Sequence, residues 1–132
     1  TVQKFIPLVG RILLSAILLM SGLGKIINFI GTQQYMAAYG MPLTGFFLVC
    51  AIILEVVGGL SVLLGYKARW GALALVIFLI PVTLLFHTKF SDQVQMIMFM
   101  KNMAILGGLL LVVSFGPGPV SVDARTTSPN TA

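Results

Sequence analysis

Charge is what this sequence has least of. Only 8% of its 132 residues are charged, whereas 58% are hydrophobic, and an ordinary soluble domain carries about 25% charged residues. A chain with so few charges cannot cover a water-facing surface, which excludes a soluble globular domain. The length allows one domain. The composition therefore predicts a single domain embedded in a lipid bilayer.

Cysteine and histidine are nearly absent as well, with Cys50 and His87 the one example of each. One cysteine excludes an internal disulfide and a cysteine metal cluster, and one histidine excludes a haem held by two histidines of the same chain. We therefore expect no metal site, and any redox role must use a diffusible cofactor or a partner's redox centre. The net charge of +5 comes without a basic run or an RNA-type aromatic motif, so nucleic acid is not an expected partner.

Long apolar runs are what the sequence has instead. Four of them approach the roughly 20 residues that cross the hydrocarbon core, and they predict an all-α fold, an integral membrane four-helix transmembrane bundle. The spans are expected at 6–29, 45–64, 70–86 and 95–115, with Tyr35 and Tyr39 as interfacial anchors on a short surface helix between the first two. The prolines and glycines of "FGPGP" end the fourth span. Residues 1–123 form the predicted membrane domain, and 124–132 a polar, flexible tail.

An even number of spans places both termini on one side of the membrane. That side would carry Lys4, Arg11, Lys67, Arg69 and Arg125, and the other side would carry Lys25, Lys89 and Lys101. Because Lys and Arg are enriched on the cytoplasmic side, both termini are predicted to be cytoplasmic.

Within the spans, polar and small residues recur at spacings of three and four, which places them on one face of each helix. Polar groups avoid lipid by facing the bundle interior, and small residues let helices approach closely. The faces predicted to point inward are Arg11, Ser15, Leu18, Gly22 and Lys25; Leu48, Ala51, Glu55, Gly58 and Val62; Val76, Thr83 and His87; and Lys101, Ala104, Gly108 and Leu111.

Glu55 lies near the middle of an apolar run and is one of three acidic residues. An unpaired charge at the bilayer centre costs at least about 2.5–3.5 kcal/mol, so Glu55 is expected to be paired or protonated, and the surplus of cations favours pairing. From the helical rise, Arg11 or Lys101 is predicted to reach Glu55, whereas Lys25 extends toward the headgroups. The cations left over suggest a guest rich in acceptors: a quinone carbonyl, an inorganic anion or a lipid head.

A structural role competes with a functional one for these residues. An ion pair with Glu55 can simply fix the helix register, His87 is more readily an interfacial histidine than a proton carrier, and Asn102 is more readily an interhelical hydrogen-bonding group. No catalytic residue is assigned. The candidate ligand-binding residues are Arg11, Lys25, Glu55, His87, Lys101 and Asn102.

Six segments, in order, carry a resemblance to a known family. They are "RILLSAILLMSGLGKIINF", "YMAAYGMP", "LEVVGGLSVLLGYKARWGA", "LLFH", "FMKNMAILGGLLLV" and "FGPGPVSVD". Together they span 11–123 and closely resemble the DoxX family of small bacterial membrane proteins. The resemblance implies a four-helix bundle in the bacterial inner membrane. It also implies a redox context, because related subunits belong to a thiosulfate:quinone oxidoreductase and others associate with redox-protective partners.

Two hypotheses for function remain open at this point. In the first, the chain is the membrane subunit of a quinone-linked oxidoreductase system without a redox centre of its own. Arg11, Glu55 and Lys101 would polarise the carbonyls of a non-covalently bound quinone, and His87 would relay a proton. In the second, it is a non-catalytic accessory or structural subunit of a larger membrane complex. The expected partners are the lipid bilayer and other membrane protein subunits.

Overall fold

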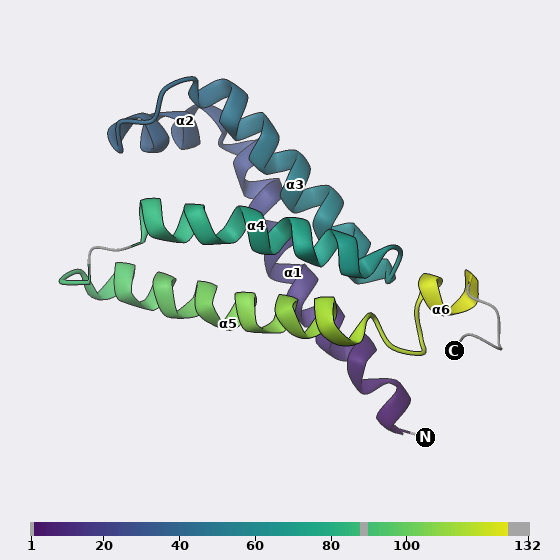
Figure 1. Cartoon of the computed structure of the whole chain (residues 1–132). Helices are drawn as coiled ribbons and strands as arrows, with labels where there is room; N and C mark the ends of the chain where they lie inside the picture. The colour runs from purple at the N-terminus through teal and green to yellow at the C-terminus, as the bar shows by residue number, and fades with distance from the viewer. Residues whose placement is uncertain (1, 88–89, 127–132) are drawn as a thin grey trace.

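The computed structural model describes residues 2–87 and 90–126, and it is helical apart from short connections (Figure 1). A 3-10 turn, η1 (Val2–Lys4), precedes six α-helices. These are α1 (Ile6–Ile27), α2 (Phe29–Ala38), α3 (Thr44–Leu64), α4 (Ala68–Phe86), α5 (Gln93–Phe115) and α6 (Val122–Thr126). Four segments are long and apolar enough to cross a membrane, namely Val2–Ile27, α3, α4 and α5.

The predicted all-helical fold with four apolar spans is therefore confirmed, and the ends of α1, α3, α4 and α5 differ from the expected ones by at most two residues. The surface helix expected between the first two spans is α2. The C-terminal region differs, since α6 includes residues 124–126 of the expected tail. Residues 127–132 lie outside the described part of the chain.

Local sequence explains where the long helices begin and end. Pro7 lies in the first turn of α1, where its missing N–H costs no hydrogen bond. Gly65 ends α3 in a left-handed conformation, at φ 70°, which glycine adopts without steric cost. Asp92 caps α5 by accepting a hydrogen bond from the backbone N–H of Val94 at 3.0 Å. Gly116 follows the last residue of α5 with φ 77°, so the helix stops where "FGPGP" predicts.

The helices pack in the order α1, α3, α4, α5, and α1 touches α5 only over a short stretch. In Figure 1, α4 and α5 run side by side while α1 and α3 cross them obliquely. Adjacent glycines allow α3 to approach both neighbours: a Cβ on Gly58 would lie 2.7 Å from Leu75 of α4, and one on Gly59 would lie 2.9 Å from Leu19 of α1. These notches bring the backbones together, as small residues do in membrane helices.

The core draws on all four long helices. It consists of Leu18, Val62, Ala68, Ala72, Leu75, Val76, Leu79, Ile105, Leu109 and Val112. The outward faces are apolar too: Ile77 of α4 and Leu111 of α5 are both exposed. An apolar exterior around an apolar core is the arrangement expected where lipid, and not water, surrounds the helices.

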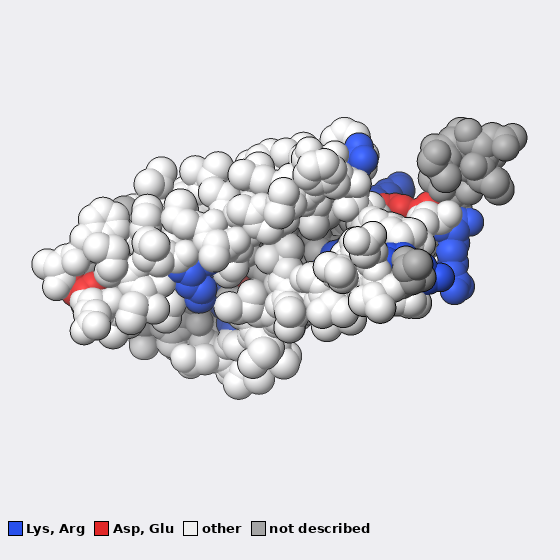
Figure 2. Space-filling model, turned by 90° about the horizontal axis from the view of Figure 1, so that it is seen from below, with Lys and Arg blue, Asp and Glu red and all other residues white. Residues whose placement is uncertain are grey.

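The two ends of the molecule differ. The N-terminus, α6 and the α3–α4 turn lie at one end, which we call the terminal end, whereas α2 and the α4–α5 connection lie at the other (Figure 1). In the space-filling view, Lys and Arg gather at the terminal end (Figure 2). Placement of both termini at the same, more basic end agrees with an even number of spans.

Candidate functional site

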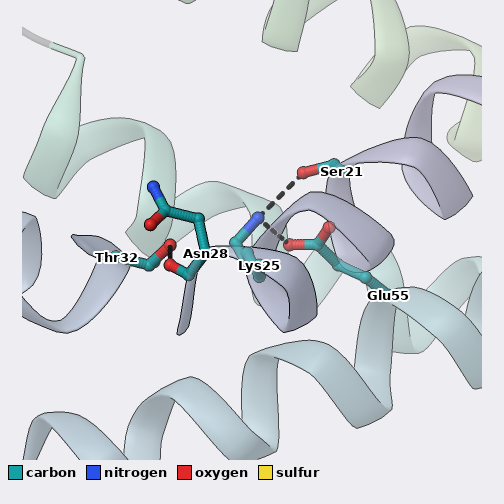
Figure 3. A network of polar contacts seen from close by, with 5 residues as sticks. All are labelled: Ser21, Lys25, Asn28, Thr32 and Glu55. Carbon is teal, nitrogen blue, oxygen red and sulfur yellow. Dashed lines mark hydrogen bonds and ion pairs between the residues drawn. The ribbon is translucent and has the colours of Figure 1, made fainter. Parts of the chain in front are cut away.

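The site is built around an ion pair between α1 and α3 (Figure 3). Lys25 Nζ lies 2.7 Å from Glu55 Oε1 and donates a hydrogen bond to Ser21 Oγ at 2.8 Å. The side chain of Glu55 is only 4% exposed, against 25% for Lys25. The second carboxylate oxygen, Oε2, is buried and has no hydrogen-bond partner among the described residues. A buried carboxylate is therefore neutralised by one cation and retains one free acceptor.

The partner of Glu55 is Lys25, so the prediction that Arg11 or Lys101 would reach it, with Lys25 directed outward, was wrong. That prediction rested on placing every span at the same depth. In the structure, α1 is set so that Gly22 lies directly against α3, with Glu55 Cβ 3.4 Å from the position of a Cβ on Gly22. Lys25 follows Gly22 by about one helical turn, so its ammonium group is the one that reaches the carboxylate.

Arg11 is buried, as predicted, and its terminal nitrogens contact backbone carbonyl oxygens. Its guanidinium donates to the carbonyl oxygens of Val62 at 3.4 Å and Leu63 at 3.5 Å, and to that of Val120. These carbonyls belong to the end of α3 and to the connection between α5 and α6. Arg11 thus ties the C-terminal connection to the α1–α3 pair, and the surplus interior charge inferred from the sequence is largely accounted for by these contacts.

The predicted inward face of α5 was also wrong, because the buried residues lie one position further along the chain. The residues of α5 that are buried are Asn102, Ile105, Leu109 and Val112, and Lys101 is exposed. Asn102 Nδ2 donates to Thr83 Oγ1 of α4 at 3.0 Å, so the amide is the polar group that α5 turns inward. The interhelical role expected for Asn102 and the inward faces of the first two spans are confirmed.

Lys25 and His87 line one pocket of about 430 Å³ between α2, α3 and α4, at the end away from the termini. Most of its walls are apolar or aromatic: Met36, Met41, Phe47, Leu48, Cys50, Ala51, Leu54, Phe78, Pro81, Val82, Leu85 and Phe86. The other polar groups are Thr32 and Tyr35 of α2. The candidate residues thus separate: Lys25 and His87 share a pocket, Glu55 pairs with Lys25, and Arg11, Lys101 and Asn102 are not among the residues that line it.

Two polar groups at the mouth of this pocket are held by neighbours. His87, the C-cap residue of α4, places Nδ1 3.1 Å from Gln95 Oε1 of α5. Tyr35 stacks on Phe86, with ring centroids 5.5 Å apart, and its hydroxyl lies 3.2 Å from that of Tyr39. Burial, together with the hydrogen bond that Tyr35 donates to Tyr39, raises the pKa of Tyr35 above its ordinary value, so the phenol stays protonated.

Thr32, Tyr35 and Phe47 line the pocket but were not among the predicted site residues. Their apolar or interfacial character can be read from the sequence, but residue spacing does not predict that a surface helix packs beside α3. The sequence of α2 (Phe29–Ala38) does contain a signal for a binding site, because this short helix carries both polar and aromatic residues and follows a span that contains a charged residue.

Fold and site together define a class: a small, all-helical membrane protein with four apolar spans and a buried ion pair beside an apolar pocket. The sequence model of the DoxX family matches residues 6–88. The chain is 46% identical over 116 residues to inner membrane protein YqjF of Escherichia coli (strain K12), which covers 88% of each chain. The chain belongs to the DoxX family, and it is an integral protein of the inner membrane.

Further similarities extend beyond this relative. The chain is 32% identical over 123 residues to inner membrane protein YphA of Escherichia coli (strain K12), covering 89% of this chain and 88% of that one. It is 30% identical over 79 residues to the ER-derived vesicles protein ERV29 of Saccharomyces cerevisiae, covering 56% of this chain and 26% of that protein. No solved structure matches.

Proposed function

We propose that this protein is the membrane subunit of a quinone-linked oxidoreductase system and binds a quinone head group in the pocket between α2, α3 and α4. One observation carries the proposal: Lys25 and His87 are among the residues that line an apolar, aromatic pocket. Ligand pockets of about 300–1,000 Å³ typically combine apolar walls with a few polar groups that fix orientation. The pocket, at about 430 Å³, lies within this range.

The donor set matches the chemistry of a quinone. A quinone has a flat apolar ring and two carbonyl oxygens that only accept hydrogen bonds. The donors among its lining residues are the Lys25 ammonium and, in its protonated form or suitable tautomer, the His87 ring, while Phe47 and Phe86 provide faces for the ring. A free inorganic anion fits less well, because Glu55 already neutralises Lys25 and most of the wall is apolar.

In such a system the quinone takes up two electrons and two protons when it is reduced. The chain has one cysteine and one histidine, so we assign the electron-carrying centre to another subunit. In this proposal the residues of this chain hold and orient the carbonyl oxygens, and His87, hydrogen-bonded to Gln95, passes a proton from the membrane surface.

Quinone binding is tested with a matched pair of variants. The chain is purified in mild detergent, and binding of a short-chain ubiquinone or menaquinone analogue is measured by equilibrium partitioning. The double variant Lys25→Met/Glu55→Leu, which removes the pair without stranding a charge, is expected to weaken binding at least about tenfold, as is His87→Phe. Lys101→Met removes an exposed lysine away from the pocket and is expected to bind as the parent does. Equal binding by all four proteins would refute the proposal.

A second candidate is the accessory subunit of a larger membrane complex. Gly24 of α1 and Gly107 of α5 are exposed, with no heavy atom within 4 Å of the position of a Cβ, and exposed glycines are where another membrane helix can approach closely. Gentle extraction from native membranes separates the two candidates. Recovery of a stoichiometric complex without bound quinone favours this one, whereas quinone bound to the chain itself favours the first.

We further propose that both termini face the cytoplasm. The support is the concentration of Lys67, Arg69 and Arg125 at the terminal end, together with the tendency of cytoplasmic segments to be rich in Lys and Arg. A reporter enzyme that is active only in the cytoplasm, fused after Arg125, is expected to be active. Activity of a periplasm-specific reporter at the same position would show that the termini face the periplasm and would contradict the proposal.

A further inference from the structure

A groove runs between α1 and α5, where these two helices diverge. Its volume is about 760 Å³. One wall is α1, from Ile6 to Ile17, and the other is α5, from Ala104 to Phe115, so the lining is almost wholly aliphatic. The small side chains of Gly10, Ala104 and Gly108 leave the space open. The groove and the proposed quinone pocket share no lining residue.

At the terminal end, this groove meets a second cavity of about 840 Å³. The two share residues 115–118 as a common wall. Lys67, Arg69 and Trp70 line the second cavity, with Arg69 packed close to Gly116. Asp123 lines it as well, but its carboxylate accepts hydrogen bonds from the backbone N–H groups of Lys67 at 2.7 Å and Ala68 at 3.0 Å. A long apolar groove thus adjoins, across residues 115–118, a cavity with a cationic surplus.

A buried polar group lies along the groove wall. Arg11 lines the groove and is only 3% exposed, yet its Nε has no hydrogen-bond partner among the described residues. Its two terminal nitrogens are used by carbonyl oxygens of the protein. A buried donor without a partner loses its hydrogen bonds to water and gains none in return, so an acceptor supplied by a ligand in the groove would stabilise the folded protein.

We propose that this composite cavity is a specific binding site for one anionic phospholipid. An acyl chain occupies the α1–α5 groove, the phosphate head lies at Lys67 and Arg69, and an ester carbonyl oxygen accepts from Arg11 Nε. Trp70 stands at the same border, where tryptophan is enriched in membrane proteins. The charge of the second cavity selects an anionic head over a zwitterionic one, because each Lys or Arg near an anionic lipid contributes to binding.

The test measures which lipid the protein retains. The purified chain is exchanged into detergent containing equal amounts of phosphatidylglycerol and phosphatidylcholine with identical acyl chains, and bound lipids are counted by native mass spectrometry. The parent is expected to retain one phosphatidylglycerol in preference. Lys67→Gln/Arg69→Gln is expected to lose this preference by roughly thirtyfold, the product of two cation contributions. The matched control, Lys4→Gln/Arg125→Gln, removes two cations of the same end that do not line the cavity, and it should behave as the parent does.

The acyl-chain groove is tested separately. Gly10→Leu fills the groove from α1 at a position where a new Cβ meets no heavy atom within 4 Å, and Gly107→Leu adds the same side chain to α5 outside the groove, in equally open space. Of these two variants, only Gly10→Leu is expected to lose the retained lipid. If Gly10→Leu reduces helix content, Leu111→Trp on the opposite wall is a second variant that blocks the groove. The proposal is overturned if the parent retains the two lipids equally, if the Lys4/Arg125 control loses as much preference as the Lys67/Arg69 variant, or if both blocking variants retain lipid.

Discussion

Removing Lys25 should destabilise this protein more than removing the charge of Glu55, although the two residues form one ion pair. In Lys25→Met, a carboxylate that is only 4% exposed loses its partner. Breaking a buried pair from one side costs about 3–5 kcal/mol, and an unpaired charge at the bilayer centre costs at least about 2.5–3.5 kcal/mol. We therefore expect Lys25→Met to lower the free energy of unfolding by about 3–4 kcal/mol.

Glu55→Gln is the milder change. Lys25 is 25% exposed, keeps its hydrogen bond to Ser21, and has a flexible stem that can turn its ammonium toward the headgroups. The expected loss is about 1.5–3 kcal/mol, the range of a hydrogen bond to a charged group. The double variant Lys25→Met/Glu55→Leu strands no charge, so we expect it to lie within about 1 kcal/mol of the parent.

The measurement is equilibrium unfolding in mixed micelles, with increasing sodium dodecyl sulfate and helix content followed by far-ultraviolet circular dichroism. The double variant Lys25→Met/Glu55→Gln, which also strands no charge, closes a double-mutant cycle with the two single variants, and in this cycle we expect non-additivity of at least about 2 kcal/mol. Lys101→Met, the control at an exposed position, should change stability by less than about 0.5 kcal/mol. Additive effects, or a larger loss in Glu55→Gln than in Lys25→Met, would show that the pair does not carry the stability assigned to it.

Three further predictions use the same unfolding assay. Gly40→Ala and Gly65→Ala both place a side chain at positive φ, 78° and 70°, but only at Gly65 would the new Cβ overlap other side chains. Both variants should lose about 1–3 kcal/mol of unfolding free energy from backbone strain. The loss should be measurably larger for Gly65→Ala. Asp123→Ala removes the acceptor for the first backbone N–H groups of α4, so a loss of about 0.5–2 kcal/mol is expected, and an unchanged midpoint would contradict the capping role. For Asn102→Leu and Thr83→Val, a double-mutant cycle should give a coupling of about 0.6 kcal/mol, as for other hydrogen bonds between membrane helices, and zero coupling would argue against the contact at 3.0 Å.

The candidate site shows how far local sequence information reaches. The inward direction of Glu55 and Arg11 was predictable, since a charged residue among small residues at helical spacing marks the face that avoids lipid. The same rule gave a wrong prediction for Lys101, which was expected to face inward because it is a lone cation on α5. The neighbouring Asn102 faces inward instead, because its amide has a partner on α4. Two neighbouring polar residues lie about 100° apart on a helix, and periodicity alone does not say which of them finds a partner.

The sequence by itself determined the solvent, the four spans and the inward faces of the first two, because charge content, run length and helical period are properties of each segment alone. Only the tertiary structure decided which cation meets Glu55. That choice depends on how far α1 slides along α3, and the slide is set where Gly22 of α1 and Gly59 of α3 let side chains of the facing helix come close. The pocket depends on the same packing, since it exists only where α2 folds back beside α3 and α4. Register between helices arises from side-chain shapes at the crossings, which no single segment contains.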